Sequence, residues 1–318
     1  MAAKANQSEL DYEFLPFLRA YKDGRIERLF GTEFLPPSVD SQIPVSSKDV
    51  SINTETSLSA RLYLPKTAST DKKLPLLIYI HGSGFVIESA FSPLYHNYLN
   101  SLVEMANVVA VSVEYRLAPE HYVPAAYSDT WEAMQWIAQG NDAWLRDFAD
   151  FDKVFVAGDS AGANIVHHMT MRAKEEALPN DVKLSGIVLA MPYFWGEEKI
   201  GKEGDHPHRD MLDKLWIFAC PTTKNGNDDP WINPMANGAL SFSNLACERV
   251  LIFVAGSDIL RDRGWMYYET LKKSGWGGEV EFVETEGEDH GFHVFNPTCE
   301  KAVIKMKRLA SFLNQDNL

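Results

Sequence analysis

The stretch VAGDSAGANI (residues 156–165) joins an apolar, strand-like run to a segment with helical periodicity. Its centre, GDSAG at residues 158–162, has the pattern G-x-S-x-G. In this pattern a serine lies on a sharp turn between a strand and a helix, where glycines remove side chains that would clash. The pattern predicts that Ser160 is a nucleophile; the alternative is a serine that caps the following helix. A serine nucleophile also needs a base, an acid that orients the base, and donors for the oxyanion.

The oxyanion donors are predicted in the stretch HGSGF (residues 81–85), which directly follows the apolar run LPLLIYI. A loop of the HGGG type at this place supplies backbone N–H groups to a developing oxyanion. We assign this role to the amides of Gly82, Ser83 and Ala161, the last at the positive end of a helix. As a dinucleotide fingerprint the loop lacks its third glycine, because position 87 is isoleucine, and it also lacks the G-K-[ST] of a Walker A loop.

The acid and the base are expected after two later strand-like runs. RVLIFVAG (residues 249–256) leads to Asp258, and EVEFVET (residues 279–285) leads to a loop that carries His290. About 32 residues separate the two side chains (290 − 258), which is room for one helix and one strand, so both would emerge at the same sheet edge as Ser160. We predict that Asp258 orients His290, which accepts the serine proton. Asp262 is the alternative acid and His293 the alternative base.

The fold is predicted from the alternation of strand-like runs with helical patterns. Helical patterns cover residues 125–139 and 163–177. The strand-like runs are residues 60–65, 74–80, 108–115, 153–158, 184–191, 249–256 and 279–285. The last six are almost continuously apolar, as expected of strands buried on both faces. This alternation predicts an α/β fold with a mostly parallel central sheet and flanking helices, and no repeat or linker divides residues 1–318, so we expect a single domain.

Two segments do not fit the alternation, and we interpret them as a cap over the carboxyl edge of the sheet, where α/β sites lie. Residues 1–40 look helical in part, around YEFLPFLRAY, and residues 192–240 are rich in Trp, Pro, Gly and Asn. An ordinary long surface insertion is the alternative. If the cap covers Ser160, we expect a substrate pocket walled by Phe85, Tyr193, Trp195 and Trp216.

Composition limits the partners of the chain. The formal charge of −14 disfavours nucleic acid and anionic membranes, and no apolar run is long enough to span a bilayer. The first residues lack an apolar signal region, and three scattered cysteines suggest reduced thiols, so a cytoplasmic protein is expected. His206 and His208 lack the helical spacing of a metal site. We therefore expect a small-molecule substrate, no metal, no cofactor, and a monomer or homodimer.

Several motifs together carry a family resemblance: HGSGF, YRLAPE, GDSAGANI, GSDILRD and DHGF. They resemble the hormone-sensitive-lipase-like branch of the α/β-hydrolases, and within it the plant carboxylesterases, over nearly the whole chain. The stretches WINP, SGWGGE and RLASFL resemble most the plant 2-hydroxyisoflavanone dehydratases and the monoterpenoid indole alkaloid cyclases. The resemblance implies an α/β-hydrolase fold without a cofactor.

Departures from these relatives favour hydrolysis. The dehydratases carry threonine where this chain has Ser160, the cyclases lose parts of the acid/base pair, and the gibberellin receptors lose the histidine. Ser83, in contrast, resembles the small non-glycine residues of the cyclase group. The resemblance thus implies a serine carboxylesterase for a short-acyl ester of a plant specialised metabolite. A dehydratase or alkaloid cyclase that reuses the same site is the alternative, followed by a non-catalytic hormone receptor.

Overall fold

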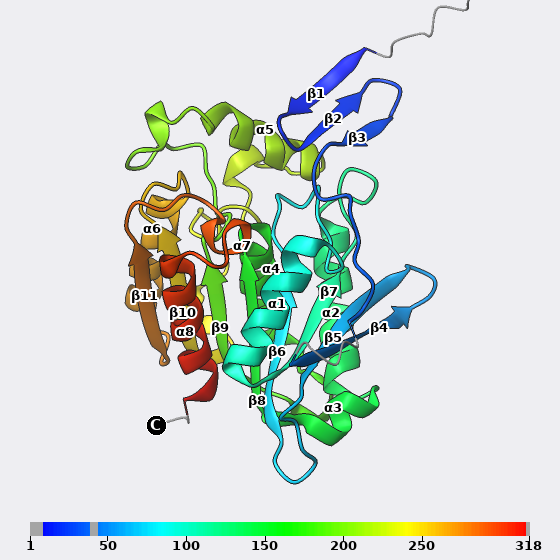
Figure 1. The fold of residues 1–318 in the computed structure, drawn as a ribbon. Helices are drawn as coiled ribbons and strands as arrows, with labels where there is room; N and C mark the ends of the chain where they lie inside the picture. Colours follow the sequence, from blue (N-terminus) through cyan, green and yellow to red (C-terminus); the bar gives the residue numbers. More distant parts are fainter. Residues whose placement is uncertain (1–8, 39–43, 316–318) are drawn as a thin grey trace, which may run out of the picture.

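The computed structural model describes residues 9–38 and 44–315, and its centre is one eight-stranded sheet (Figure 1). The strands lie in the order β11-β10-β9-β8-β6-β7-β5-β4, and all neighbours are parallel except β4–β5 and β5–β7. Their bounds are β4 Val45–Asn53, β5 Leu58–Pro65, β6 Leu74–Ile80, β7 Val109–Glu114, β8 Ala149–Asp159, β9 Leu184–Ala190, β10 Cys247–Ala255 and β11 Glu279–Thr285. The predicted mostly parallel α/β sheet is confirmed.

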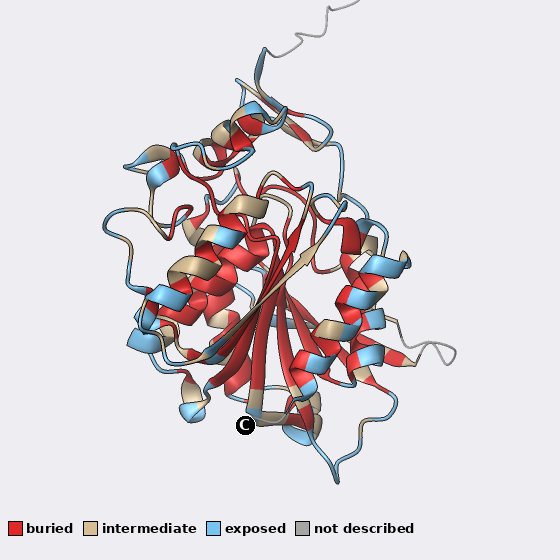
Figure 2. Cartoon of the chain, turned by 90° about the vertical axis from the view of Figure 1, so that its left-hand side faces the viewer, coloured by how far each residue is buried: buried red, intermediate tan, exposed pale blue. Residues whose placement is uncertain are grey.

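Helices cover both faces of this sheet, and Figure 2 shows the buried strands between them. The helices are α1 Pro93–Ala106, α2 Pro124–Ala138, α3 Ala143–Phe148, α4 Ala161–Glu175, α5 Arg209–Ala219, α6 Arg261–Lys273, α7 Phe292–Phe295 and α8 Glu300–Asn314. Helices α1 and α8 pack together on one face, and α2 and α4 pack together on the other. Every residue of β9 is buried, as its continuous apolar run predicts. In the described part of the chain, no helix is both long and apolar enough to cross a membrane.

Strand β11 departs from the expectation of burial on both faces. It forms the end of the sheet, and six of its seven residues are half-buried while the first is exposed. Its glutamates Glu279, Glu281 and Glu284 interrupt the apolar side chains. Charged side chains are a common feature of edge strands, which must not pair with other chains.

The expectation of helix near the start of the chain is wrong. Strands β1 Leu10–Phe14, β2 Leu18–Tyr21 and β3 Ile26–Arg28 form a separate antiparallel sheet. Pro16 could not donate an interior helical hydrogen bond, and it lies instead in the turn between β1 and β2. Gly24, at φ +87°, closes the second turn in a conformation that favours glycine. Strand β4 was also not predicted, because its polar residues break up any apolar run.

The β1–β3 sheet and helix α5 lie together above the carboxyl ends of the parallel strands (Figure 1). The Phe218 ring of α5 lies 5.1 Å from the ring centroids of both Tyr12 and Phe14. These contacts tie the two predicted cap segments to each other. Residues 1–8 and 39–40 of the predicted cap lie outside the described residues.

Candidate active site

Ser160 occupies the turn between β8, which ends at Asp159, and α4, which begins at Ala161. Its backbone has φ +52° and ψ −119°, a conformation rare for residues with a side chain. The turn brings α4 very close to β6: a Cβ atom on Gly162 would lie 2.1 Å from the Ile80 carbonyl oxygen. The Ser160 side chain makes no capping hydrogen bond, so the helix-cap interpretation does not fit the structure.

The predicted base and acid form a chain of hydrogen bonds with this serine. His290 Nε2 lies 2.9 Å from Ser160 Oγ, and His290 Nδ1 lies 2.7 Å from Asp258 Oδ2. The Asp258 side chain is fully buried, and its other carboxylate oxygen accepts the Leu260 N–H at 2.9 Å. The carboxylate is therefore fixed on both sides and orients the imidazole. The structure brings together the three residues predicted from the ends of separate strands.

Two features of the environment of His290 shift its pKa in opposite directions. Burial alone lowers the pKa, but the charge and hydrogen bond of Asp258 raise it, and the net shift is upward. The imidazolium that forms when the ring takes a proton is thereby stabilised. A serine hydroxyl held against this ring can lose its proton as it attacks an electrophile.

The predicted oxyanion loop differs from expectation at Gly82. Its N–H donates to the Tyr95 hydroxyl at 2.9 Å, so this amide is not free for an oxyanion. Within the described residues, the N–H groups of Ser83 and Gly84 have no hydrogen-bond partner. Ala161 is the first residue of α4, so its N–H has no acceptor within the helix. Ser83, Gly84 and Ala161 are the amides that fit the role.

The alternative acid and base do not join the site. Asp262 accepts hydrogen bonds from the Arg261 guanidinium and from the Lys202 N–H. His293 is buried with its ring edge-on to Tyr98 at 5.3 Å, and neither ring nitrogen has a hydrogen-bond partner among the described residues. The two side chains serve packing and surface pairing.

A cavity of about 300 Å³ opens onto Ser160 and His290. Its walls are mainly apolar and come from the β1–β3 sheet, from α5 and from the loops that follow β6, β10 and β11. The apolar side chains are Phe14, Leu15, Pro16, Phe17, Phe30, Val86, Ile87, Leu94, Met211, Leu212, Leu215, Ile259, Leu260, Val294 and Phe295. The polar lining includes His206 and His208, for which we considered only a metal site from the sequence and rejected it. Such walls suit an apolar ligand with few polar groups.

Tyr193 lines this cavity as predicted, but Phe85, Trp195 and Trp216 do not. All three are fully buried behind the wall. The Phe85 ring lies 6.1 Å from Trp216, whose indole N–H donates to the Gly226 carbonyl at 3.0 Å. The guanidinium groups of two arginines lie over the Trp195 ring, and its indole N–H donates to a carboxylate of α5 at 2.7 Å. These aromatic residues support the wall instead of forming its surface.

Many of the lining residues that sequence reasoning missed come from two places. Those of residues 14–30 lie in the small sheet that was expected to be partly helical. In α5, Leu215 lies four residues after Met211 and three after Leu212, which places the three side chains on one helical face and is a signal in the sequence. That signal does not say whether the face meets the core or a cavity.

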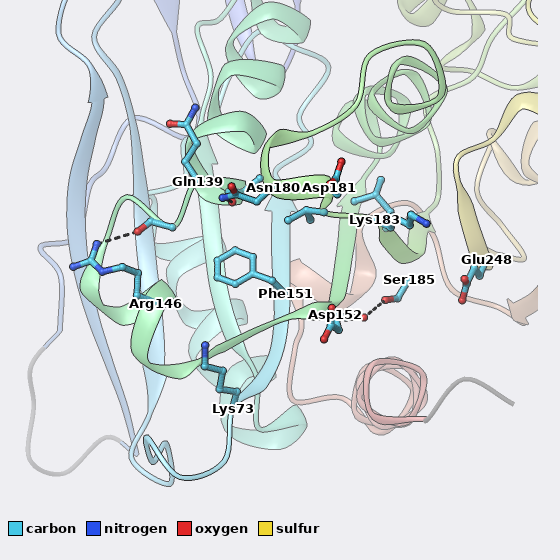
Figure 3. Close-up of a pocket in the computed structure, with 14 residues that line it drawn as sticks. Lys73, Gln139, Arg146, Phe151, Asp152, Asn180, Asp181, Lys183, Ser185 and Glu248 are labelled. Atoms are coloured by element: carbon cyan, nitrogen blue, oxygen red, sulfur yellow. Dashed lines mark hydrogen bonds between the residues drawn. The ribbon is translucent and has the colours of Figure 1, made fainter.

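A second cavity, of about 650 Å³, lies at the other end of the sheet, where β8 and β9 begin (Figure 3). Exposed charged side chains of both signs line it, among them Lys73, Arg146 and Asp152. Arg146 donates to the Gly140 carbonyl at 2.9 Å. None of Ser160, His290 and Asp258 lies there, and we assign it no chemistry.

Comparison with known proteins agrees with this geometry. The model of a family described as the α/β-hydrolase fold matches residues 77–294, which include the oxyanion loop and all three residues of the triad. The chain belongs to the α/β-hydrolase fold family. Within this family it is 48% identical to probable carboxylesterase 2 of Arabidopsis thaliana. The alignment covers 98% of this chain and 99% of that protein.

Two further relatives of this α/β-hydrolase show the breadth of the likeness. A 2-hydroxyisoflavanone dehydratase of Glycyrrhiza echinata is 45% identical, with 96% of each chain covered. The solved esterase of Pyrobaculum calidifontis has a TM-score of 0.70 and 28% identity, with 84% of each chain covered. The predicted resemblance to plant carboxylesterases and 2-hydroxyisoflavanone dehydratases is confirmed.

Proposed function

We propose that this α/β-hydrolase is a serine carboxylesterase that hydrolyses a short-acyl ester of a plant specialised metabolite. The observation that carries the proposal is the hydrogen-bonded sequence Asp258–His290–Ser160 at an apolar cavity. The carboxylesterase relative, nearly half identical over almost all of both chains, supports the same activity. The apolar walls support an alcohol or acyl group with few polar atoms.

The reaction follows from the order of these groups. His290 Nε2 takes the Ser160 proton as Oγ attacks the acyl carbon. The amides of Ser83, Gly84 and Ala161 donate to the oxyanion, each contributing about 10²–10³ in rate. His290 then protonates the leaving alkoxide, and the acyl group remains on Ser160. A water molecule, deprotonated by the same ring, releases the acid and restores the serine. None of these steps calls for a metal or cofactor, and a small molecule is the partner that we expect.

A lyase reaction is the second candidate function. A relative named 2-hydroxyisoflavanone dehydratase and the serine at position 83 favour it. In a dehydratase or alkaloid cyclase, His290 would remove a substrate proton while the oxyanion loop polarises a carbonyl, and Ser160 would form no covalent bond. A non-catalytic receptor is the third candidate. The cytoplasmic location and the monomeric or homodimeric state stay predictions.

Hydrolysis of 4-nitrophenyl acetate and butyrate by the purified chain tests these functions. For an esterase, we expect Ser160→Ala to lower kcat about 10³-fold or more, because the nucleophile is gone. Ser101→Ala, an exposed serine of α1, is the matched control and should leave kcat unchanged. Turnover that survives Ser160→Ala but is abolished by His290→Ala would contradict the esterase and favour the lyase. Ligand binding by a wild type that turns nothing over would favour the receptor.

A further inference from the structure

Two buried tyrosines hold the oxyanion loop from opposite sides. The Tyr115 hydroxyl, just after β7, lies 2.9 Å from the His81 carbonyl oxygen and 3.1 Å from the Gly82 carbonyl oxygen. The Tyr95 hydroxyl, on α1, accepts the Gly82 N–H and donates to Asp159 Oδ2, both at 2.9 Å. Asp159 is the residue before the nucleophile. One side chain thus joins the oxyanion loop to the nucleophile turn.

The planarity of the peptide bond gives these contacts a direction. In a trans peptide the carbonyl oxygen and the next N–H point to opposite sides. The His81–Gly82 peptide follows this rule, with its carbonyl at Tyr115 and its N–H at Tyr95. In the next peptide the Gly82 carbonyl oxygen lies 3.1 Å from the Tyr115 hydroxyl and 3.2 Å from His81 Nδ1, so the Ser83 N–H points away from Tyr115. That N–H is one of the free amides of the loop.

The nucleophile turn lies directly beside Gly82. A Cβ atom on Gly82 would lie 3.0 Å from the Ser160 Cβ and 2.5 Å from an Asp159 carboxylate oxygen. The loop and the turn are therefore in van der Waals contact at this glycine. A small rotation of either peptide would change the distance from the Ser83 N–H to an oxygen bound at Ser160.

We propose that Tyr95 and Tyr115 are positioning residues that aim the Ser83 N–H at the oxyanion, with Tyr95 setting the loop against the nucleophile turn through Asp159. This inference rests on the proposed esterase function. Oxyanion donors work at 2.7–3.1 Å from the charged oxygen, a position that the carbonyl oxygen of the substrate reaches only in the transition state. The two hydroxyls should therefore act on kcat and leave KM nearly unchanged.

Burial keeps both hydroxyls in the form that this role needs. It raises the pKa of Tyr95 and of Tyr115 well above the usual value, so both retain their protons at neutral pH. The His81 ring stacks on Tyr115 at 4.2 Å, and burial lowers the pKa of that ring to about 3. The neutral imidazole therefore adds no charge near the loop.

Tyr79 offers a matched control. Its hydroxyl donates to the other oxygen of Asp159, also at 2.9 Å, and the side chain is buried, but it makes no hydrogen bond to the loop. Tyr79→Phe and Tyr95→Phe therefore each remove one hydrogen bond from the same carboxylate. Only Tyr95→Phe also releases the Gly82 N–H.

The test measures kcat and KM for 4-nitrophenyl butyrate in Tyr95→Phe, Tyr115→Phe and Tyr79→Phe, with the inhibition constant of a trifluoromethyl ketone that forms a tetrahedral adduct. We expect Tyr95→Phe and Tyr115→Phe to lower kcat about ten-fold, less than the loss of a whole donor, with KM within about two-fold. The ketone should bind more weakly by a similar factor. Tyr79→Phe should stay within about two-fold of wild type in all three quantities.

Equal losses in all three variants, or no loss in folded Tyr95→Phe and Tyr115→Phe, would overturn the inference. Wild-type turnover that survives Ser160→Ala would instead overturn the proposed function, and this inference with it. A crystal structure of the wild type with a boronate bound covalently to Ser160 tests the proposal without any variant, so it applies even if the variants do not fold. We expect a boronate oxygen within hydrogen-bond distance of the Ser83 N–H. An oxygen bound by the Gly82 N–H, with the Tyr95 contact broken, would contradict the proposal.

Discussion

Ser160 adopts a backbone conformation that costs about 1–3 kcal/mol for a residue with a side chain. Packing on both sides of the turn imposes this conformation. Gly158 and Gly162 leave no room for a Cβ atom: one on Gly158 would lie 2.5 Å from the Gly162 carbonyl carbon. The hydroxyl is thereby raised from the end of β8 toward His290.

We expect Gly162→Ala to lower the free energy of unfolding by about 1–3 kcal/mol or more, because the added methyl group collides with the Ile80 carbonyl. Urea denaturation measures the change, and kcat should fall with it as the turn moves. Gly277→Ala is the control, since a Cβ there meets no atom within 4 Å. Equal stability of the two variants would contradict the packing argument.

Asp258→Asn should lower kcat by about 10⁴-fold, because an amide favours the wrong tautomer of His290. The base must be neutral, so kcat/KM of the wild type falls as the pH falls through the raised pKa of His290. Without the carboxylate, burial still lowers this pKa, and the acidic limb of the profile should move to lower pH. Asp262→Asn should change neither quantity. A pH–rate profile of each variant tests this prediction. An acidic limb that does not move in Asp258→Asn would count against the assignment of Asp258 as the acid of the triad.

The residues of the triad could be predicted because each follows a strand-like run in the sequence, and the carboxyl ends of parallel strands meet at one edge. The amide of Gly82 could not be judged in this way. Its partner, Tyr95, lies on a helix with no sequence signal that links the two. A backbone donor is free or occupied only through contacts across space.

The β1–β3 sheet shapes part of the cavity without belonging to the central sheet. Its contact with α5 is aromatic, through Phe218, Tyr12 and Phe14. Phe14 also lines the cavity. The position of the small sheet on α5 therefore sets part of the substrate wall.

Phe218→Ala should raise KM for 4-nitrophenyl butyrate several-fold and lower the free energy of unfolding by about 3–5 kcal/mol, because a buried ring and its two partners are lost. Thermal unfolding and steady-state kinetics measure the two effects. Phe34→Ala, which removes a ring that is 64% exposed, should leave both nearly unchanged. A normal KM in Phe218→Ala would show that the small sheet holds its place without this contact.

Most strands of the central sheet could be predicted from their apolar runs. The expected bounds of β6 and β11 are those of the structure, and those of β7 and β9 differ by a residue at one or both ends. Residues 12–21 were misjudged because their aromatic spacing fits a helix as well as a hairpin. Trp195 and Trp216 were expected in the pocket, since the sequence does not distinguish a buried support from an exposed wall.

In the whole molecule, a buried charge cluster joins the cap to the body. Glu203 accepts from Arg209 at 3.0 Å and from Arg263 of α6 at 2.6 Å, and all three side chains are buried. Both guanidinium groups also lie over the Trp195 ring, at 4.6 and 5.6 Å. Helix α6 follows the loop that carries Asp258, so this cluster holds the cap close to the triad.

We expect Glu203→Gln to lower the free energy of unfolding by about 3–5 kcal/mol, because two buried guanidinium groups lose their shared carboxylate. Urea denaturation checks the change. Glu269→Gln, which breaks a surface pair with the exposed Lys273, is the control and should stay within about 0.5 kcal/mol of wild type. A loss no larger than that of the control would mean that the cluster adds nothing to the attachment of the cap.

The separation of the cavity walls from the reacting groups has an evolutionary consequence. Ser160, Asp258 and His290 follow strands of the main sheet, whereas much of the wall comes from residues 14–30 and from α5. Substitutions in these two stretches reshape the cavity, and so change which molecule it accepts, without moving a reacting atom. Duplicated genes can therefore diverge toward new substrates through changes in these two stretches alone, and each intermediate form keeps its reacting groups in place.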